Sequence, residues 1–311
     1  MANYVIRRLL MIIPIIFGIL FLTFLIKALI PTDAVSALFS GTVSEDKAAE
    51  AIAQIREKYH LDLPWYRQFG IYVWDVMHLD LGESVRTRQP VIDEIGFRYV
   101  NTLILAFSAL IVAIVVGLVT GMLSAYFKNT WIDVTSMSVG MMGISMPAFF
   151  LGFVLIFIFS VQLRWLPVIG RGDFQSLILP ALTLGFIEAA ALSRVTRSSM
   201  LDVLSREYIR TARAKGMSES YILFRHALPN AFLSILTMIG LQIGNLLGGA
   251  FIIEVIFGWH GIGELAVKAI QWRDFTITQA VILVSAGTYV FVNLIVDLLY
   301  TWVDPRISYE E

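Results

Sequence analysis

We first searched the sequence for side chains whose types and spacing could perform catalysis. The four histidines, His60, His78, His226 and His260, are scattered, and the chain has no cysteine. Neither the zinc-binding pattern H-E-x-x-H nor the nucleophile pattern G-x-S-x-G occurs, and no G-x-x-x-x-G-K-[ST] phosphate loop is present. The sequence therefore argues against a metal enzyme, protease or lipase. Energy for any active work would come from another subunit or from an ion gradient.

Three acids lie within or at the ends of apolar segments: Glu188, Glu254 and Asp297. A charge at the centre of a bilayer costs roughly 2.5–3.5 kcal/mol on insertion scales, and such acids often mark ion pathways. However, Glu254 ends its apolar segment and Glu188 is close to Arg194, so pairing at the membrane interface is a simpler explanation. We expect structural roles, and a proton-coupled carrier that uses Glu188 or Asp297 stays as the alternative.

Small and polar residues form two stripes along the apolar segment 230–256. One stripe repeats every four residues, which allows close helix approach: Gly240, Gly244 and Gly248. The other is more polar: Ser234, Met238, Gln242, Asn245 and Gly249. The stripes are centred about 120° apart on a helix, so one could pack while the other lines a translocation path. Hydrogen bonding of Gln242 and Asn245 to a neighbouring helix is equally compatible with the pattern.

Two further features concern helix shape. Gly117 and Gly121 form a shorter small-residue stripe, for which helix packing is expected. Pro147 interrupts an apolar segment near Gly143 and Gly152, so we expect a kink there that is either a hinge or a fixed bend.

The segment 206–229 is basic and has signals for helix ends. Arg206, Arg210 and Arg213 fall on one helical face, and Gly216 can take the left-handed conformation that ends a helix. Ser218 is placed to cap a second helix, and Pro229 suits the first turn of the next span. We predict two short helices joined by a glycine turn, and a basic loop that only sets topology is the alternative.

The composition identifies the kind of fold. The 311 residues are 58% hydrophobic and 15% charged, against about 45–50% and 25% in soluble domains. A net charge of −1 argues against nucleic-acid binding, and the lack of cysteine excludes disulfides. Apolar segments of about twenty residues each match the thickness of a bilayer. We predict an all-α, multi-pass membrane helix bundle.

Six segments are long enough to span the membrane: 9–30, 101–127, 131–161, 177–192, 230–256 and 278–303. The loop 193–229 has seven basic residues, whereas 162–176 and 258–277 have two each. Basic residues concentrate in cytoplasmic loops, so this loop and the N-terminal Arg7 and Arg8 are placed inside. Six spans with both ends in the cytoplasm follow.

The chain divides into an N-terminus with the first span (1–30), an extracytoplasmic cap (31–99), a five-helix core (100–303) and a cytoplasmic tail (304–311). A cleaved signal peptide before about residue 37 is disfavoured, because the apolar stretch exceeds about 7–15 residues. The cap should hold a helix over 45–59 and an amphipathic segment over 65–76. The Gly-rich stretch 257–263 predicts a re-entrant turn, a possible gate, followed by a surface helix with Trp272 at the interface.

The segment 206–229 resembles the signature cytoplasmic loop of permease subunits in binding-protein-dependent ABC importers. That pattern is E-A-A, three residues, Gly, nine residues and I-x-L-P, and Ala212, Gly216, Leu228 and Pro229 are in register. Arg210, Thr211 and His226 depart from it. The run R-T-A-R-A-K-G at 210–216 is similar instead to the B-type subunit of the dipeptide/oligopeptide branch. Further similar stretches include 56–64, 80–82, 145–147, 165–167, 179–182 and 304–306, so the resemblance covers almost the whole chain.

The resemblance implies that this chain is half of the pore of a peptide importer in a prokaryotic inner membrane. Its partners would be a second, C-type permease, two cytoplasmic ATPases that bind ATP and Mg²⁺, and an extracytoplasmic solute-binding protein. The chain itself would hold no cofactor or metal and catalyse no reaction. The residues implied in ATPase coupling are Arg206, Arg210, Thr211, Ala212, Arg213, Ala214, Lys215, Gly216, Leu228 and Pro229.

The cargo stays open among a dipeptide, a longer peptide, glutathione, a nickel chelate and a related small solute. A self-sufficient proton-coupled transporter and a membrane-embedded enzyme are the alternatives from other classes.

Overall fold

The computed structural model describes residues 2–29, 63–169 and 173–303, and every regular element in these ranges is a helix. The predicted all-α class is confirmed. The expected cap helix over 45–59, the disfavoured cleavage site and the tail 304–311 lie outside the described residues.

Four helices are long and apolar enough to cross a membrane, over Val91–Tyr126, Phe174–Leu204, Glu219–Gly248 and Phe275–Leu298. Two pairs of bent helices raise the possible number of spans to six. The N-terminal helix α1 (Ala2–Leu29) adds a shorter apolar stretch, Leu10–Leu25. These elements contain all six predicted segments, with changed bounds.

The core is the long contact between α5 (Val91–Tyr126) and α8 (Phe174–Leu204). Its closeness depends on glycine: a Cβ on Gly121 would lie 2.7 Å from the Ser193 carbonyl oxygen, and one on Gly117 would lie 2.9 Å from the Leu192 Cβ. Gly185 of α8 makes the reciprocal approach to α5. Gly117 and Gly121 thus lie in a helix contact, as the sequence predicted.

The predicted span over 131–161 is sharply bent at the predicted kink. It consists of α6 (Trp131–Ser145), α7 (Ala148–Leu155) and a π-helical stretch η1 (Ile156–Gln162), and the two parts meet at 110°. Pro147 precedes α7 in an extended conformation (φ −58°, ψ 139°). Proline has no N–H to continue the helix and it disfavours helical geometry in Met146, so the chain breaks where a kink was expected.

The cytoplasmic loop is shorter than the predicted 193–229, because α8 continues as a helix through Leu204. Ser193, Thr196 and Met200 are buried, so this extension packs although it lies beyond the apolar segment. The loop then forms α9 (Glu207–Ala214) and α10 (Glu219–Tyr221). A π-helical stretch η2 (Ile222–Ala227) joins α10 to α11 (Leu228–Phe257), so the second short helix is the start of the fifth span.

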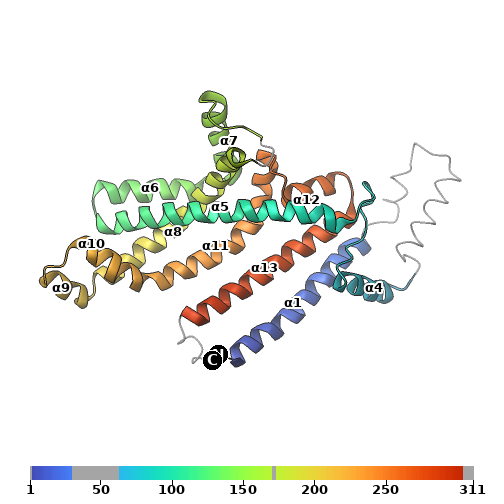
Figure 1. Ribbon diagram of the computed structural model, residues 1–311, viewed down its shortest axis with the longest axis horizontal. Helices are drawn as coiled ribbons and strands as arrows, with labels where there is room; N and C mark the ends of the chain where they lie inside the picture. Colours follow the sequence, from blue (N-terminus) through green and yellow to red (C-terminus); the bar gives the residue numbers. More distant parts are fainter. Residues whose placement is uncertain (1, 30–62, 170–172, 304–311) are drawn as a thin grey trace.

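The other end of the molecule is capped by α4 and α12 (Figure 1). The amphipathic helix predicted over 65–76 is α4 (Trp65–Met77), whose Phe69 ring packs on three aromatic rings of α1. At Gly258, which has a φ of 61°, α11 ends, and α12 (Ile262–Gln271) leaves at 78°. The last helix is α13 (Phe275–Val303). The predicted turn over 257–263 is therefore present, and α9 and α10 lie at the opposite end of the long axis.

Candidate coupling loop and translocation path

The loop formed by α9 and α10 has a small hydrophobic core of its own. Ile209, Ala212 and Ile222 are buried and pack against Leu204 at the end of α8. Gly216 has a φ of 75°, the left-handed conformation that the sequence predicted, with no atom within 4 Å of an added Cβ. The Ser218 hydroxyl caps α10 by accepting from the Tyr221 N–H at 3.4 Å. The loop is thus a folded knob rather than an extended connection.

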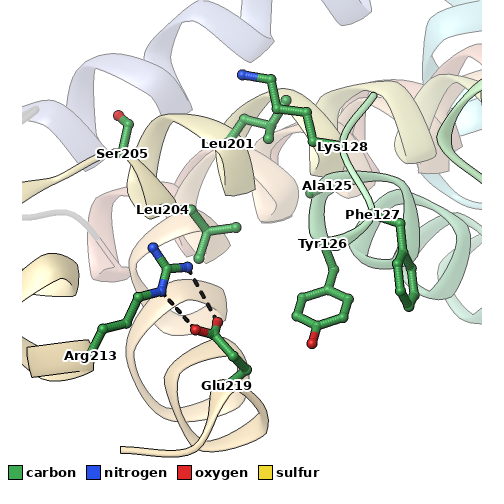
Figure 2. A pocket seen from close by; sticks show the side chains of 9 residues that line it. All are labelled: Ala125, Tyr126, Phe127, Lys128, Leu201, Leu204, Ser205, Arg213 and Glu219. Atoms are coloured by element: carbon green, nitrogen blue, oxygen red, sulfur yellow. Dashed lines mark hydrogen bonds and ion pairs between the residues drawn. The ribbon is translucent and has the colours of Figure 1, made fainter. Parts of the chain in front are cut away.

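An ion pair closes this knob across the glycine turn (Figure 2). Arg213 Nε and Nη2 donate to the two carboxylate oxygens of Glu219 at 2.8 and 3.2 Å. The hydrogen bonds that Arg213 donates to the Glu219 carboxylate raise the pKa of Arg213 further above its ordinary value. Of the three arginines predicted on one helical face, Arg213 is therefore engaged inside the knob. Arg210 is more available to a partner than Arg213. Its side chain is 75% exposed, and its ion pair with Glu207 is long, at 3.9 Å.

The remaining residues implied in coupling occupy three environments. Ala212 is buried and Leu228 is half-buried in the packed interior. The exposed residues are Arg206, Thr211, Ala214, Lys215, Gly216 and Pro229. Most of the residues implied in coupling are therefore accessible to a partner, while Ala212 packs inside the knob.

A cavity of about 540 Å³ lies between the knob and the α5–α6 turn (Figure 2). The α5–α6 turn contributes Ala125–Lys128, α8 contributes its last turn, and the knob contributes Arg213 and Glu219. The knob therefore lies near the ends of α5 and α8, in addition to α11, which it continues into.

Asp133 joins three helices at this end, and sequence reasoning missed it. Its carboxylate accepts two hydrogen bonds from Arg197 of α8, both at 2.7 Å, one from the Ser124 hydroxyl of α5, and one from the Asn129 N–H at 2.9 Å. The sequence did contain a signal for this contact. Asp133 lies at the start of the apolar segment 131–161, and Arg197 follows the next apolar segment, 177–192. This cluster fixes the α5–α6 turn to α8.

The polar stripe predicted on the fifth span does not lie on one exposed face. Gln242 is fully buried and donates its Nε2 to the Glu188 carbonyl of α8 at 2.7 Å, and Met238 packs in the core beside Ile235. Ser234 and Asn245 are exposed, whereas the burial of Gly249 is not described. The exposed stripe is rotated and holds Ser234, Thr237, Leu241, Asn245 and Gly248.

The glycine stripe on the same helix is also divided. Gly240 and Gly244 are buried, and a Cβ on Gly244 would lie 2.8 Å from the Tyr289 ring of α13. Gly248 is exposed, and a Cβ there would meet nothing within 4 Å. The prediction of packing thus fails for Gly248 within this chain, because α11 packs on α8 and α13 from two directions.

Two of the three membrane acids have structural partners. Glu254 is fully buried and accepts from the Thr102 hydroxyl at 2.6 Å and from the N–H groups of Gly263 and Glu264 at 2.7 and 3.0 Å. It thereby fixes the turn between α11 and α12. Asp297 pairs with Arg8 of α1 at 3.0 Å.

The third acid, Glu188, lacks the expected partner. It is half-buried at the middle of α8, and its carboxylate makes no hydrogen bond or ion pair with any residue that the structure describes. The expected pairing with Arg194 at the membrane interface is therefore wrong.

The segment 84–86 contacts the turn after α12, which sequence reasoning did not anticipate. Ser84 donates to the buried Asp274 carboxylate at 2.5 Å, and the Arg86 guanidinium lies 3.8 Å from the centre of the Trp272 ring. Glu264 of α12 binds Arg98 at 3.2 Å and Lys268 at 2.6 Å. The end of the molecule opposite the knob is therefore tied together by several polar contacts.

Comparison with known proteins identifies the family. A family model described as "binding-protein-dependent transport system inner membrane component" matches residues 113–309. The chain belongs to this family. The glutathione transport system permease protein GsiC of Escherichia coli strain K12 is 43% identical over 310 residues, which cover 100% of both chains. The same permease of Shigella flexneri serotype 5b has equal identity and coverage.

Solved structures agree on the fold. An inward-facing structure of the MetNI methionine ABC transporter, in its native crystal form, aligns with a TM-score of 0.56 and 19% identity. It covers 66% of this chain and 93% of the other chain. The protein is therefore an inner-membrane permease subunit of an ABC importer, and its family is a transport component rather than an enzyme. Within the described residues, no three side chains of His, Asp or Glu are grouped as a metal site.

Proposed function

We propose that this chain forms half of the translocation path of an ATP-driven importer of peptides or peptide-like solutes. The loop over 205–224 would be the element through which ATPase subunits move the spans. The observation that supports this most directly is the continuity of α10, η2 and α11. A loop that packs on the start of a transmembrane helix can transmit a displacement that a flexible loop would absorb.

The internal contacts of the knob suit this role. Its core of Ile209, Ala212 and Ile222 and the Arg213–Glu219 ion pair make α9 and the start of α11 one unit. A helix rises about 1.5 Å per residue, so α11 extends on the order of 45 Å toward the opposite end. There Glu254 joins it to the turn before α12. Displacement of the knob would thus reach both ends of the path.

The proposed partners are a second permease, two ATPases that bind ATP and Mg²⁺, and a solute-binding protein. A second permease is supported by the exposed stripe on α11, because an amide group such as that of Asn245 is costly against lipid. Two permease chains that face each other along this stripe would enclose a polar path. The chain itself would need no cofactor.

The proposed cargo is a small peptide, and glutathione, itself a tripeptide, is favoured by the names of the relatives. The test is reconstitution of the chain with its three kinds of partner in liposomes. We expect uptake of glutathione or a di- or oligopeptide that requires ATP and the binding protein. Uptake of a nickel chelate alone would contradict the peptide assignment.

The second candidate is a proton-coupled carrier, and it is favoured by Glu188, which has no partner among the residues that the structure describes. This carrier would transport solute as a purified chain, with a proton gradient and no ATP. The same liposomes without ATPase subunits distinguish the two functions, because the proposed importer is then inactive even with a gradient applied.

A further inference from the structure

Glu188 lies within the long apolar helix α8, where that helix contacts α11. It is close to the midpoint of α8 (Phe174–Leu204), and its carbonyl accepts from Gln242, which is close to the midpoint of α11 (Leu228–Phe257). Since both helices rise by the same distance per residue and are joined at this point, the two side chains lie at the same depth. That depth is about half way between the helix ends.

Nothing in the described part of the chain compensates this carboxylate. No hydrogen bond or ion pair to it is present among those residues. The apolar segments that pack around α8 contain no lysine or arginine over 99–127, 134–162 or 228–253. Gln242 adds a second acceptor, because its Oε1 is buried and receives no hydrogen bond. Two acceptors at the α8–α11 contact therefore lack a donor among the described residues.

Three other acids in or beside the apolar segments have partners within the chain. Asp133 binds Arg197, Asp297 binds Arg8, and Glu254 accepts from a hydroxyl and two backbone N–H groups. Each is explained by the chain's own architecture. Since an uncompensated charge in a bilayer is costly and no described residue compensates Glu188, its partner is to be sought outside the described part of the chain.

We propose that Glu188 binds the ammonium group of the cargo during its passage, and that the transported class is therefore solutes with a primary amine. Free peptides and glutathione both have such a group. The inference rests on the proposed function as an importer. One charge-assisted hydrogen bond is strong enough to orient an ammonium group and weak enough to release it, as a transport site requires.

The first test measures transport by the complete reconstituted importer with Glu188→Gln, which preserves shape and removes the charge. We expect uptake at saturating cargo to fall about tenfold or more, as loss of a charged hydrogen bond predicts. ATP hydrolysis stimulated by the loaded binding protein should persist, so cargo moved per ATP falls. Glu188→Asp should recover much of the uptake, and Asp202→Asn, at an exposed acid in the last turn of α8, should match the unaltered protein.

The proposal is overturned if Glu188→Gln transports at the unaltered rate. It is also overturned if the variant loses the second permease on purification, because Glu188 would then pair with that subunit. If the unaltered complex itself shows no ATP-dependent uptake, the proposed function fails instead, and the second test still reports on Glu188.

The second test uses the absence of cysteine from the chain. Glu188→Cys in the assembled complex should react with a charged, membrane-impermeant thiol reagent, and the loaded binding protein with ATP should slow the reaction. The matched control is Ile111→Cys, which lies on the exposed apolar face of α5 and should stay unlabelled in lipid. Labelling at position 188 as low as at position 111 would contradict contact with the cargo.

Discussion

Gly216 gives the sharpest test of the coupling loop. A side chain there would have space, so the left-handed backbone conformation alone favours glycine. Its φ is 75°, and an added Cβ would have no atom within 4 Å. Gly216→Ala therefore introduces no clash, and its cost is the left-handed penalty of roughly 1–2 kcal/mol for a residue with a Cβ. A cost of this size disfavours the observed turn about 5- to 30-fold.

The expected result is partial uncoupling of the reconstituted importer. The knob would spend more time in conformations in which α9 and α11 are not one unit, so cargo uptake per ATP hydrolysed should fall several-fold, while basal ATP hydrolysis continues. Gly216→Asn should be milder, because asparagine tolerates the left-handed region better than alanine. Uptake and phosphate release are measured on the same liposomes.

The matched control is Gly96→Ala, at a helical site of α5 where an added Cβ also meets nothing within 4 Å. That change should leave coupling intact and slightly stabilise the helix, by about 0.5–1 kcal/mol. Equal coupling ratios for Gly216→Ala and the unaltered protein would refute the reasoning. So would an asparagine variant as impaired as the alanine variant.

Three other changes test the packing that supports the loop and the path. Gly121→Ala should lower the free energy of unfolding of the purified protein by about 1–3 kcal/mol in a thermal melt, since α5 and α8 must separate. The control is Gly140→Ala, whose Cβ would be 3.8 Å from its nearest neighbour and which should not lower that free energy. Asp133→Asn should cost about 1–3 kcal/mol by leaving Arg197 without its anion, and adding Arg197→Gln should recover part of the loss in a thermal melt. Glu254→Gln should accelerate amide exchange over 257–265 about tenfold, whereas unchanged exchange would show that the turn does not depend on this carboxylate.

The sequence predicted the features that depend on local signals. Apolar length identified the spans, and the order of Gly216 and Ser218 identified the turn and cap of the loop. These features follow from the bilayer and from backbone conformation, so few distant contacts are needed to infer them. The sharp turn after Phe257 was equally visible in its glycines.

The errors concern features that depend on distant partners. The helix α8 continues past Leu192 because Thr196 and Met200 pack on neighbouring helices, which a count of basic residues does not report. The exposed stripe of α11 is rotated, because burial of Gln242 depends on where α8 lies. The isolation of Glu188 became visible only once every neighbouring helix was placed.

The most direct test of the central claim, that the α9–α10 knob receives the motion of the ATPases, is cross-linking from a single cysteine. Tyr208→Cys places a thiol on α9, where the tyrosine is 44% exposed. Leu79→Cys places one two residues after α4, the helix that lies at the opposite end of the molecule. The account predicts that position 208 cross-links to an ATPase subunit and that the yield changes when ATP binds, whereas position 79 does not cross-link to it. An assembled, active importer in which position 208 reaches no ATPase subunit, or reacts with reagent from outside the cell, would contradict the account.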